Sequence, residues 1–419
     1  MFKKKQFKLF IIIIFLVFSA VFLIYISKSK LAKYPPPWLP NSIQVVLKGI
    51  FDKKSFQKIS NDYNEKFIPE TQLINLKFEK VKLNFLSDAE KGYFQKQVQK
   101  TKDVYKNFYI DIYQTEKLMI TNSNAQSFLL DISNTKNGLE INEIINLDSN
   151  LKPKKVLDTL VIGDLIFTSY IEDKNNCRNF VISKAEINKK YLNYEEFFRE
   201  DKCAEFIQGG RMQPLTFENK KGLIFSIADN VADRPNDEPQ SDNSNFGKLI
   251  FKSFDNGKNL IFSKGHRNPQ GLLVLDEVIL ETEHGPKGGD EINKIIYKGN
   301  YGWPISSYGK KYKSAETYKK SHKQFGFQEP IFSFVPSIGI SELIKVPNSF
   351  NEEWQENFLL SSLNKHCLFR IKFDKNFNKV VYYEEIFIGQ RIRDLKYFKN
   401  HVLLALENKG EIGIFSVKD

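Results

Sequence analysis

The most distinctive part of the chain runs from residue 265 to residue 304 and reads GHRNPQGLLVLDEVILETEHGPKGGDEINKIIYKGNYGWP. Apolar runs separate three segments rich in glycine, proline and polar residues: Gly265–Gly271, Glu281–Asn293 and Gly299–Pro304. Glycine and proline at such places are typical of turns. One turn of this kind is an ordinary connection between strands. Three of them within 40 residues, all carrying polar side chains, predict a binding site.

The polar residues of these segments indicate which ligand chemistry they suit. The first segment supplies donors, Arg267 and Asn268 among them. The second exposes backbone carbonyls around Gly285 and Pro286 and carries carboxylates such as Asp290. Carbonyl and carboxylate oxygens suit a hard cation such as Ca²⁺. An arginine opposite them suits an anionic ligand that bridges to the metal.

Outward from this stretch, short apolar runs alternate with turn residues from about residue 108 to the end of the chain. Examples are Phe108–Tyr113, Leu165–Tyr170, Gly222–Ile227 and Val402–Leu406. Many short strands with almost no helical spacing predict an all-β fold. The region is too long for one β-sandwich and fits a propeller of six or so blades, at roughly 50 residues per blade. We therefore predict a propeller domain over residues 106–419.

These motifs resemble those of a known family, the soluble quinoprotein glucose dehydrogenases with their aldose and sorbosone dehydrogenase relatives. The resemblance rests on GHRNPQG, HGP-GGDEIN and NYGWP in this order, and it continues in Arg391-Ile392-Arg393-Asp394. It covers about residues 105–419 and is strongest from residue 205 onward. It implies a six-bladed β-propeller of four-stranded antiparallel blades. It also implies that pyrroloquinoline quinone (PQQ) and Ca²⁺ bind at the top of the central tunnel.

The resemblance assigns roles to residues of the central stretch. Arg267 and Asn268 are similar to the pair that contacts the quinone, and Arg267 is expected to act in catalysis as well. The carbonyls of Gly285 and Pro286 match the calcium ligands of the family. His284 falls where relatives place a glutamine or a histidine beside the cofactor.

Three further residues complete the expected site. Arg391 and Arg393 resemble the arginine pair that holds the cofactor carboxylates, a task that guanidinium groups perform through paired hydrogen bonds. Asp229 resembles the aspartate at the family's Gly-Asp strand end, although Ala228 replaces the glycine, and it is expected to be catalytic.

The sequence departs from the family pattern at two positions. The family's catalytic base is a histidine in a pattern like H-x-G-G-R, and the matching stretch here begins with Ile207, which cannot accept a proton. Asn364 falls where the family has a cofactor-binding lysine, and Lys365 would match only after a slip of one residue. A slip of one on a strand turns the side chain to the other face. The replacement bases that we consider are Asp229, Asp233, His266 and His284.

The N-terminus predicts a membrane anchor. Residues 9–26 contain no charged side chain, and a helix of this length spans about 27 Å, which is enough for the hydrocarbon core. A basic tail over residues 1–8 favours a cytoplasmic N-terminus. The alternative is a cleaved signal peptide, whose apolar region is usually shorter and ends in small residues. Residues 27–105 then form a stalk and an accessory segment, partly helical and partly extended.

Charge and cysteine content narrow the function further. The formal net charge is +12, and seven lysines of residues 1–34 supply more than half of it. This location argues for a membrane segment and against a nucleic-acid partner. Cys177 and Cys203 lie 26 residues apart and could form a disulfide in an oxidising compartment, and unrelated thiols, including Cys367, are the alternative.

We therefore expect a PQQ-dependent sugar dehydrogenase homologue with a modified site. It would be anchored by one span in the inner (cytoplasmic) membrane, face the periplasm, and pass electrons from a sugar to a respiratory acceptor. The alternative is a propeller without catalysis that binds a glycan, a small ligand or a protein, because a fold does not fix a function.

Overall fold

The computed structural model describes residues 76–86 and 105–417, apart from 136–137, 188–189, 231–235, 256, 313, 315 and 320. The predicted membrane span at residues 9–26 and most of the 27–105 segment lie outside these residues. Within the described ranges, no helix has the length and apolar character needed to cross a membrane.

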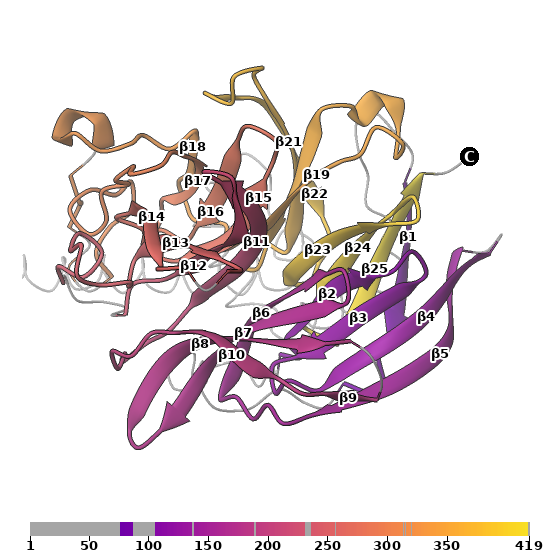
Figure 1. Cartoon of the computed structure of the whole chain (residues 1–419). Helices are drawn as coiled ribbons and strands as arrows, with labels where there is room; N and C mark the ends of the chain where they lie inside the picture. The colour runs from indigo at the N-terminus through magenta and orange to yellow at the C-terminus, as the bar shows by residue number, and fades with distance from the viewer. Residues whose placement is uncertain are drawn as a thin grey trace, which may run out of the picture. The chain divides into compact units, whose positions relative to one another are not determined.

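The described chain forms six β-sheets, and we call them blades 1 to 6 in the order of their inner strands β2, β6, β11, β15, β19 and β23 (Figure 1). The strands of blades 1 to 3 are β2 (Phe108–Tyr113), β3 (Lys117–Asn122), β4 (Ser127–Thr135), β5 (Gly138–Ser149) and β9 (Tyr191–Leu192); β6 (Lys155–Ile162), β7 (Leu165–Lys174), β8 (Cys177–Glu186) and β10 (Glu195–Arg199); and β11 (Gly209–Phe217), β12 (Lys220–Ile227), β13 (Lys248–Ser253) and β14 (Leu260–Lys264). Blades 4 to 6 contain β15 (Pro269–Val274), β16 (Ile279–Glu283), β17 (Asp290–Ile295) and β18 (Phe332–Phe334); β19 (Ile340–Lys345), β20 (Asn357–Ser362), β21 (Cys367–Phe373) and β22 (Val380–Phe387); and β23 (Ile392–Phe398), β24 (His401–Leu406), β25 (Glu411–Val417) and β1 (Leu76–Lys82). Two short 3₁₀ helices, His322–Phe325 and Glu352–Trp354, connect strands.

The blades are arranged in a closed ring. The inner strands β2, β6, β11, β15, β19 and β23 each contact the inner strand of the next blade, and β23 contacts β2. Neighbouring strands within the blades pair antiparallel, except for a short parallel pairing of β5 with β9. The prediction of an all-β, six-bladed propeller is therefore confirmed.

The ring is closed by a strand from the N-terminal side of the domain. Strand β1 pairs along its whole length with β25, from Leu76 opposite Val417 to Lys82 opposite Glu411. It lies in the segment that we assigned to the stalk and accessory region, so the predicted domain start at residue 106 omits one strand of blade 6. Most side chains of β1 are only partly buried, so its sequence lacks the clear apolar alternation that marks a strand.

Phenylalanine-rich clusters between adjacent blades form the core. Between blades 2 and 3, the ring of Phe180 stacks on Phe225 at 6.2 Å and Phe198 meets Phe225 edge-on at 4.8 Å. All three rings are buried. The high phenylalanine content of the sequence therefore serves blade packing, where aromatic rings bury a large apolar area.

One arginine connects the inner strands of all six blades. Arg211 lies on β11, and its guanidinium donates hydrogen bonds to the backbone carbonyls of Gln270 on β15 and Arg393 on β23. It forms ion pairs with the carboxylates of Asp158 on β6 (2.9 Å), Glu342 on β19 (2.9 Å) and Asp394 on β23 (3.4 Å). Its guanidinium carbon also lies 5.4 Å from the centroid of the Tyr109 ring on β2.

The carboxylates around Arg211 outnumber the cations. Asp111 on β2 and Lys396 on β23 complete the buried group. Burial raises the pKa of Asp158 to about 8 against the opposing effect of Arg211, and burial raises the pKa of Asp111 to about 7 against the effect of Lys396. Burial thus favours the protonated forms of Asp158 and Asp111, and the ion pair of Asp158 with Arg211 and the charge of Lys396 oppose it.

Cys177 and Cys203 form a disulfide, with their Cα atoms 5.0 Å apart. It joins the start of β8 to the loop that follows β10, so it fixes the outer edge of blade 2. Cys367 is a free, buried thiol.

Replacing Arg211 with methionine should destabilise the propeller strongly. The substitution leaves Asp158, Glu342 and Asp394 buried without their counterion, and removing one partner of a buried ion pair typically costs about 3–5 kcal/mol. Chemical denaturation measures the loss. Arg178→Met is the matched control, because Arg178 pairs with Asp173 at the surface, where such pairs contribute about 0–1 kcal/mol. Equal losses in the two variants would contradict the role of Arg211.

The contribution of Asp158 and Asp111 to the free energy of unfolding should fall as the pH rises from about 4 to about 8. Asp158 and Asp111 bind protons more tightly when folded than when unfolded, where an aspartate has a pKa of about 3.9. The stability that these protons provide is complete below the unfolded pKa and is lost as the pH passes the folded pKa. Denaturation at several pH values measures the slope. Asp158→Asn should flatten it, whereas Asp276→Asn at an exposed turn should leave it unchanged.

Candidate active site

A cavity of about 580 Å³ lies where the inner strands begin. Its lining includes Lys155 and Gly209, the first residues of β6 and β11, and Tyr109, Gln270 and Arg393, the second residues of β2, β15 and β23. Gly339, directly before β19, completes the circle. All six blades therefore contribute to its wall.

The structure brings all the sequence-predicted site residues to this one cavity. Those that line it are Asp229, Arg267, Asn268, His284, Gly285, Pro286, Arg391 and Arg393. They come from segments up to 164 residues apart in the chain, as from Asp229 to Arg393. The geometry therefore supports a common site, while the role of each residue stays a prediction.

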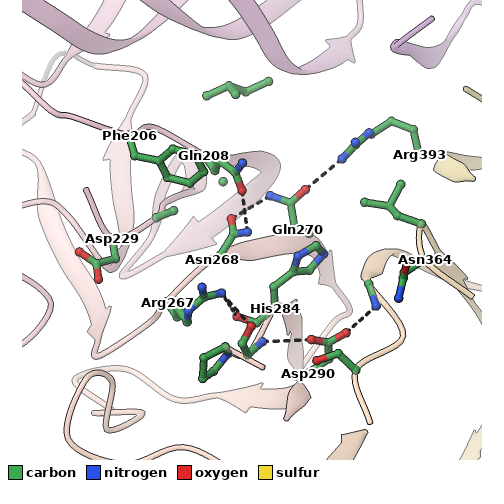
Figure 2. A pocket seen from close by; sticks show the side chains of 18 of the residues that line it. Phe206, Gln208, Asp229, Arg267, Asn268, Gln270, His284, Asp290, Asn364 and Arg393 are labelled. Atoms are coloured by element: carbon green, nitrogen blue, oxygen red, sulfur yellow. Dashed lines mark hydrogen bonds between the residues drawn. The ribbon is translucent and has the colours of Figure 1, made fainter. Parts of the chain in front are cut away.

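Three side-chain amides form a hydrogen-bonded chain across the cavity wall (Figure 2). Arg393 donates to Oε1 of Gln270 (3.1 Å), Nε2 of Gln270 donates to Oδ1 of Asn268 (3.0 Å), and Nδ2 of Asn268 donates to Oε1 of Gln208 (2.7 Å). Because a guanidinium can only donate, it fixes the orientation of each amide in turn. Arg393 of blade 6 thus positions Asn268, which directly precedes the first strand of blade 4.

Arg267 faces the backbone of the glycine-rich loop. Its Nη1 donates to the carbonyls of His284 (2.9 Å) and Gly285 (2.8 Å), and its guanidinium lies 5.3 Å from the ring of Trp303. Its Nε is buried and has no hydrogen-bond partner among the described residues. A buried donor without a partner is costly, so such atoms are uncommon in folded proteins.

Asp290 holds the loop that carries Gly285. One of its carboxylate oxygens accepts the N–H of Gly285, and the other accepts the N–H groups of Ile338, Gly339 and Ile340 (2.7–3.1 Å). Its carboxylate is therefore engaged in positioning two loops at the cavity edge. Gly285 itself has no room for a side chain, because a Cβ would lie 2.1 Å from the Gly289 carbonyl oxygen.

The opposite wall is basic. Arg391 and Arg393 both bind the fully buried carboxylate of Glu407, whose pKa they lower against the effect of burial. Lys155 lines the same wall, and burial, reinforced by Arg393 and Arg391, lowers the pKa of its ammonium group to about 8. Three basic side chains and one carboxylate leave this wall with a net positive charge, which suits an anionic ligand.

Comparison with known proteins supports this geometry. A model of the glucose/sorbosone dehydrogenase family matches residues 161–414. The chain belongs to this family. It is 33% identical over 160 residues to the aldose sugar dehydrogenase of Escherichia coli strain K12, which is 36% of this chain and 42% of that protein. It is 49% identical over 53 residues to quinoprotein glucose dehydrogenase B of Acinetobacter calcoaceticus, which is 12% of this chain and 11% of that protein.

The matches with these curated relatives therefore span less than half of each relative's length. Solved structures match over more of the chain. The structure of the soluble aldose sugar dehydrogenase of Escherichia coli in its apo form superposes with a TM-score of 0.62 at 19% identity, over 82% of this chain and 99% of that chain. The PQQ-bound aldose sugar dehydrogenase of Streptomyces coelicolor gives 0.56 at 15% identity, over 82% and 99%. At these identities, the likeness shows the shared fold.

The two departures from the family pattern have structural counterparts. Ile207 is buried in the apolar cluster between blades 2 and 3 and does not line the cavity, whereas its neighbours Phe206 and Gln208 do (Figure 2). Asn364 lines the cavity, and Lys365 is exposed and pairs with Glu385 at 3.5 Å. A slip of one residue therefore brings no lysine to the site.

Lys155 is the lysine that sequence reasoning missed. It comes from blade 2, far in sequence from the Leu363-Asn364-Lys365 stretch of blade 5 in which we looked for a lysine. The one available signal was its place at the start of a predicted strand, and that signal does not distinguish it from its neighbour Lys154.

Of the four candidate bases, Asp229 and His284 line the cavity. His266 is fully buried outside the cavity, its ring stacked on Tyr301, and Asp233 lies outside the described residues. Asp229 lines the cavity, and its two oxygens accept hydrogen bonds from Asn236 and from the indole N–H of Trp303 (both 2.7 Å). His284 lines the cavity with Nε2 on the carbonyl of Ile340.

Introducing a histidine at residue 207 should not restore a base. Ile207→His places an imidazole among apolar side chains, at a cost of about 1–3 kcal/mol, and leaves the cavity wall unchanged. Phe206→His places the imidazole at the cavity and should give the larger gain in any sugar-oxidising activity. Thermal unfolding and dye reduction measure the two effects. A gain in activity for Ile207→His above that of Phe206→His would contradict this assignment.

Proposed function

We propose that the protein is a PQQ-dependent sugar dehydrogenase with an altered base. The observation that carries the proposal is the convergence of Arg267, Asn268, Arg391, Arg393 and Lys155 on one cavity whose basic wall lies beside a carbonyl-rich loop. This arrangement suits a planar, acidic redox cofactor.

The residues fit the two groups that the family implies. PQQ carries carboxylates, and Arg391, Arg393 and Lys155 supply the cations to bind them. For Ca²⁺, the Gly285 carbonyl accepts one bond from Arg267 and keeps a second lone pair. No described residue donates a hydrogen bond to the Pro286 carbonyl. These two oxygens would hold the ion, and Arg267, which lines the cavity beside them, would contact the cofactor.

The bound cofactor, polarised by the metal, would take a hydride from the sugar. The protein would then supply orientation and a proton acceptor. Among the described cavity-lining residues, Asp229 and His284 are the candidates, because the carboxylate of Asp290 already accepts four N–H groups. The Ile340 carbonyl can only accept, so Nε2 of His284 carries the hydrogen and Nδ1 keeps its lone pair in the neutral ring. Burial lowers the pKa of His284 and favours that neutral form.

We further propose that the domain is anchored in the inner membrane, faces the periplasm and reduces a respiratory acceptor. The apolar stretch at residues 9–26 supports the anchor, and the disulfide of Cys177 with Cys203 supports an oxidising compartment. The second candidate function is a binding protein without catalysis. The loss of the family histidine at Ile207 and of the family lysine at Asn364 favours it.

The test adds PQQ and Ca²⁺ to the purified full-length chain and follows dye reduction over a panel of aldoses, together with the thermal shift. Stabilisation with dye reduction supports the dehydrogenase. Stabilisation without dye reduction supports the binding protein, and no stabilisation rejects a PQQ site. If dye is reduced, Asp229→Asn and His284→Gln identify the base, whose removal should cost about 10²–10⁴-fold in kcat while PQQ still binds.

Replacing Lys155 with methionine should weaken PQQ binding about tenfold, as expected for the loss of one charge-assisted contact of about 1.4 kcal/mol. In the unmodified protein, binding should weaken as the pH rises through about 8, because the ammonium of Lys155 is lost, and this dependence should be absent in the variant. Isothermal titration measures both effects. Lys154→Met removes an adjacent, exposed lysine and should change neither.

A further inference from the structure

A second polar cluster lies inside blade 4, apart from the cavity. One nitrogen or oxygen atom from each of His266, Glu281 and Glu283 lies within 4.8 Å of the others. The three residues are at most 4% exposed, and none of them lines the cavity. His266 comes directly before β15, and the two glutamates lie on β16, so blade 4 alone builds the cluster.

The cluster contains polar atoms without partners. Nδ1 of His266 has no hydrogen bond and faces Oε1 of Glu283 at 3.5 Å. Oε1 of Glu281 and Oδ1 of Asn293 are buried and also have no hydrogen-bond partner. Most buried polar atoms are satisfied, and an ion that bridges them is one explanation for a group that is not.

The surrounding hydrogen bonds leave the acceptors pointing inward. Nε2 of His266 lies 2.8 Å from the hydroxyl of Ser263, and a hydrogen donated there leaves Nδ1 with a free lone pair. Asn293 donates to Oε2 of Glu281 (3.0 Å) and to Oε1 of Glu283 (3.1 Å). Histidine ligands of metals usually donate their other N–H in this way, and carboxylate ligands are usually hydrogen-bonded.

The charges also call for a cation. Among the described residues, neither Glu281 nor Glu283 pairs with a lysine or an arginine. Glu283 has His266 as its one ion-pair partner among the described residues, at 3.5 Å, and Glu281 has none. Buried carboxylates that lack a full counterion are costly. A divalent cation would neutralise both.

We infer that His266, Glu281 and Glu283 bind a divalent first-row metal ion, and that Zn²⁺ suits this set of one imidazole and two carboxylates best. Zinc binds nitrogen and oxygen ligands at about 2.0–2.2 Å, so two ligand atoms on one ion lie at most about 4.4 Å apart. The ligand atoms of the cluster lie within 4.8 Å of one another, close to this limit.

The ion would have a structural role that does not depend on the proposed dehydrogenase activity. Oε2 of Glu283 accepts the backbone N–H groups of Arg267 (2.6 Å) and Asn268 (3.3 Å). Fixing Glu283 from its other side therefore fixes the backbone of the two residues that enter the cavity. Because none of the three ligands lines the cavity, the ion would position the backbone of Arg267 and Asn268 and would take no part in catalysis.

The test grows cells in medium with added zinc and measures the metal content of the purified full-length chain after brief exposure to a chelator. We expect about one zinc per chain in the unmodified protein and none in Glu281→Gln, which keeps the size of the side chain and removes its charge. Glu291→Gln is the matched control, because Glu291 is an equally buried carboxylate of blade 4 outside the cluster, and it should keep the zinc.

A second measurement covers the case in which Glu281→Gln does not fold. The unmodified chain is unfolded with a chelator and refolded with and without Zn²⁺, and the ion should raise its melting temperature. The inference is overturned if the purified chain holds no transition metal and melts at the same temperature with and without Zn²⁺. Bound protons would then neutralise the two glutamates. Loss of zinc from Glu291→Gln as complete as from Glu281→Gln overturns the assigned ligands.

Discussion

The guanidinium of Arg211 is the interaction on which the other features of the structure depend. It contacts the inner strand of each of the five other blades, through three carboxylates, two carbonyls and one aromatic ring. The two carbonyls belong to Gln270 and Arg393, whose side chains continue into the hydrogen-bonded chain of the cavity. The buried guanidinium that connects the blades thus also fixes the backbone of Gln270 and Arg393, two residues of the candidate site.

The site combines a rigid frame with a surplus of positive charge. Arg393 fixes three amides in one direction, and Asp290 fixes two loops through backbone N–H groups. The basic side chains that line the cavity are therefore already ordered before a ligand binds. Preorganisation of this kind lowers the cost of binding a charged ligand, because little side-chain freedom remains to be lost. It is equally useful to a dehydrogenase and to a binding protein.

Sequence reasoning found the repeated features and missed the irregular ones. Short apolar strands predicted an all-β propeller of six or so blades from local patterns, whereas the residues of the cavity were predicted from the resemblance to the dehydrogenase family. The sequence could not predict that Ile207 lies outside the cavity lining. The residue precedes a bulge, where the pairing of β11 with β12 shifts between Gly209 and Met212 and the alternation of side chains is interrupted. Lys155 was missed because its neighbours in space come from other blades. Strand β1 was missed because its partner lies more than 300 residues later in the chain.

The pairing of β1 with β25 has a consequence for synthesis of the protein. Blade 6 needs both β1 and β25, the first and the last of the described strands, so it cannot be completed on the ribosome before β25 has been translated. Until then, the apolar faces of blades 1 and 5 that pack against blade 6 stay exposed, and exposed apolar surface is prone to associate with other chains. A chain that is still being translated therefore exposes apolar surface that a chaperone would bind, and a chain truncated before β25 would keep that surface exposed.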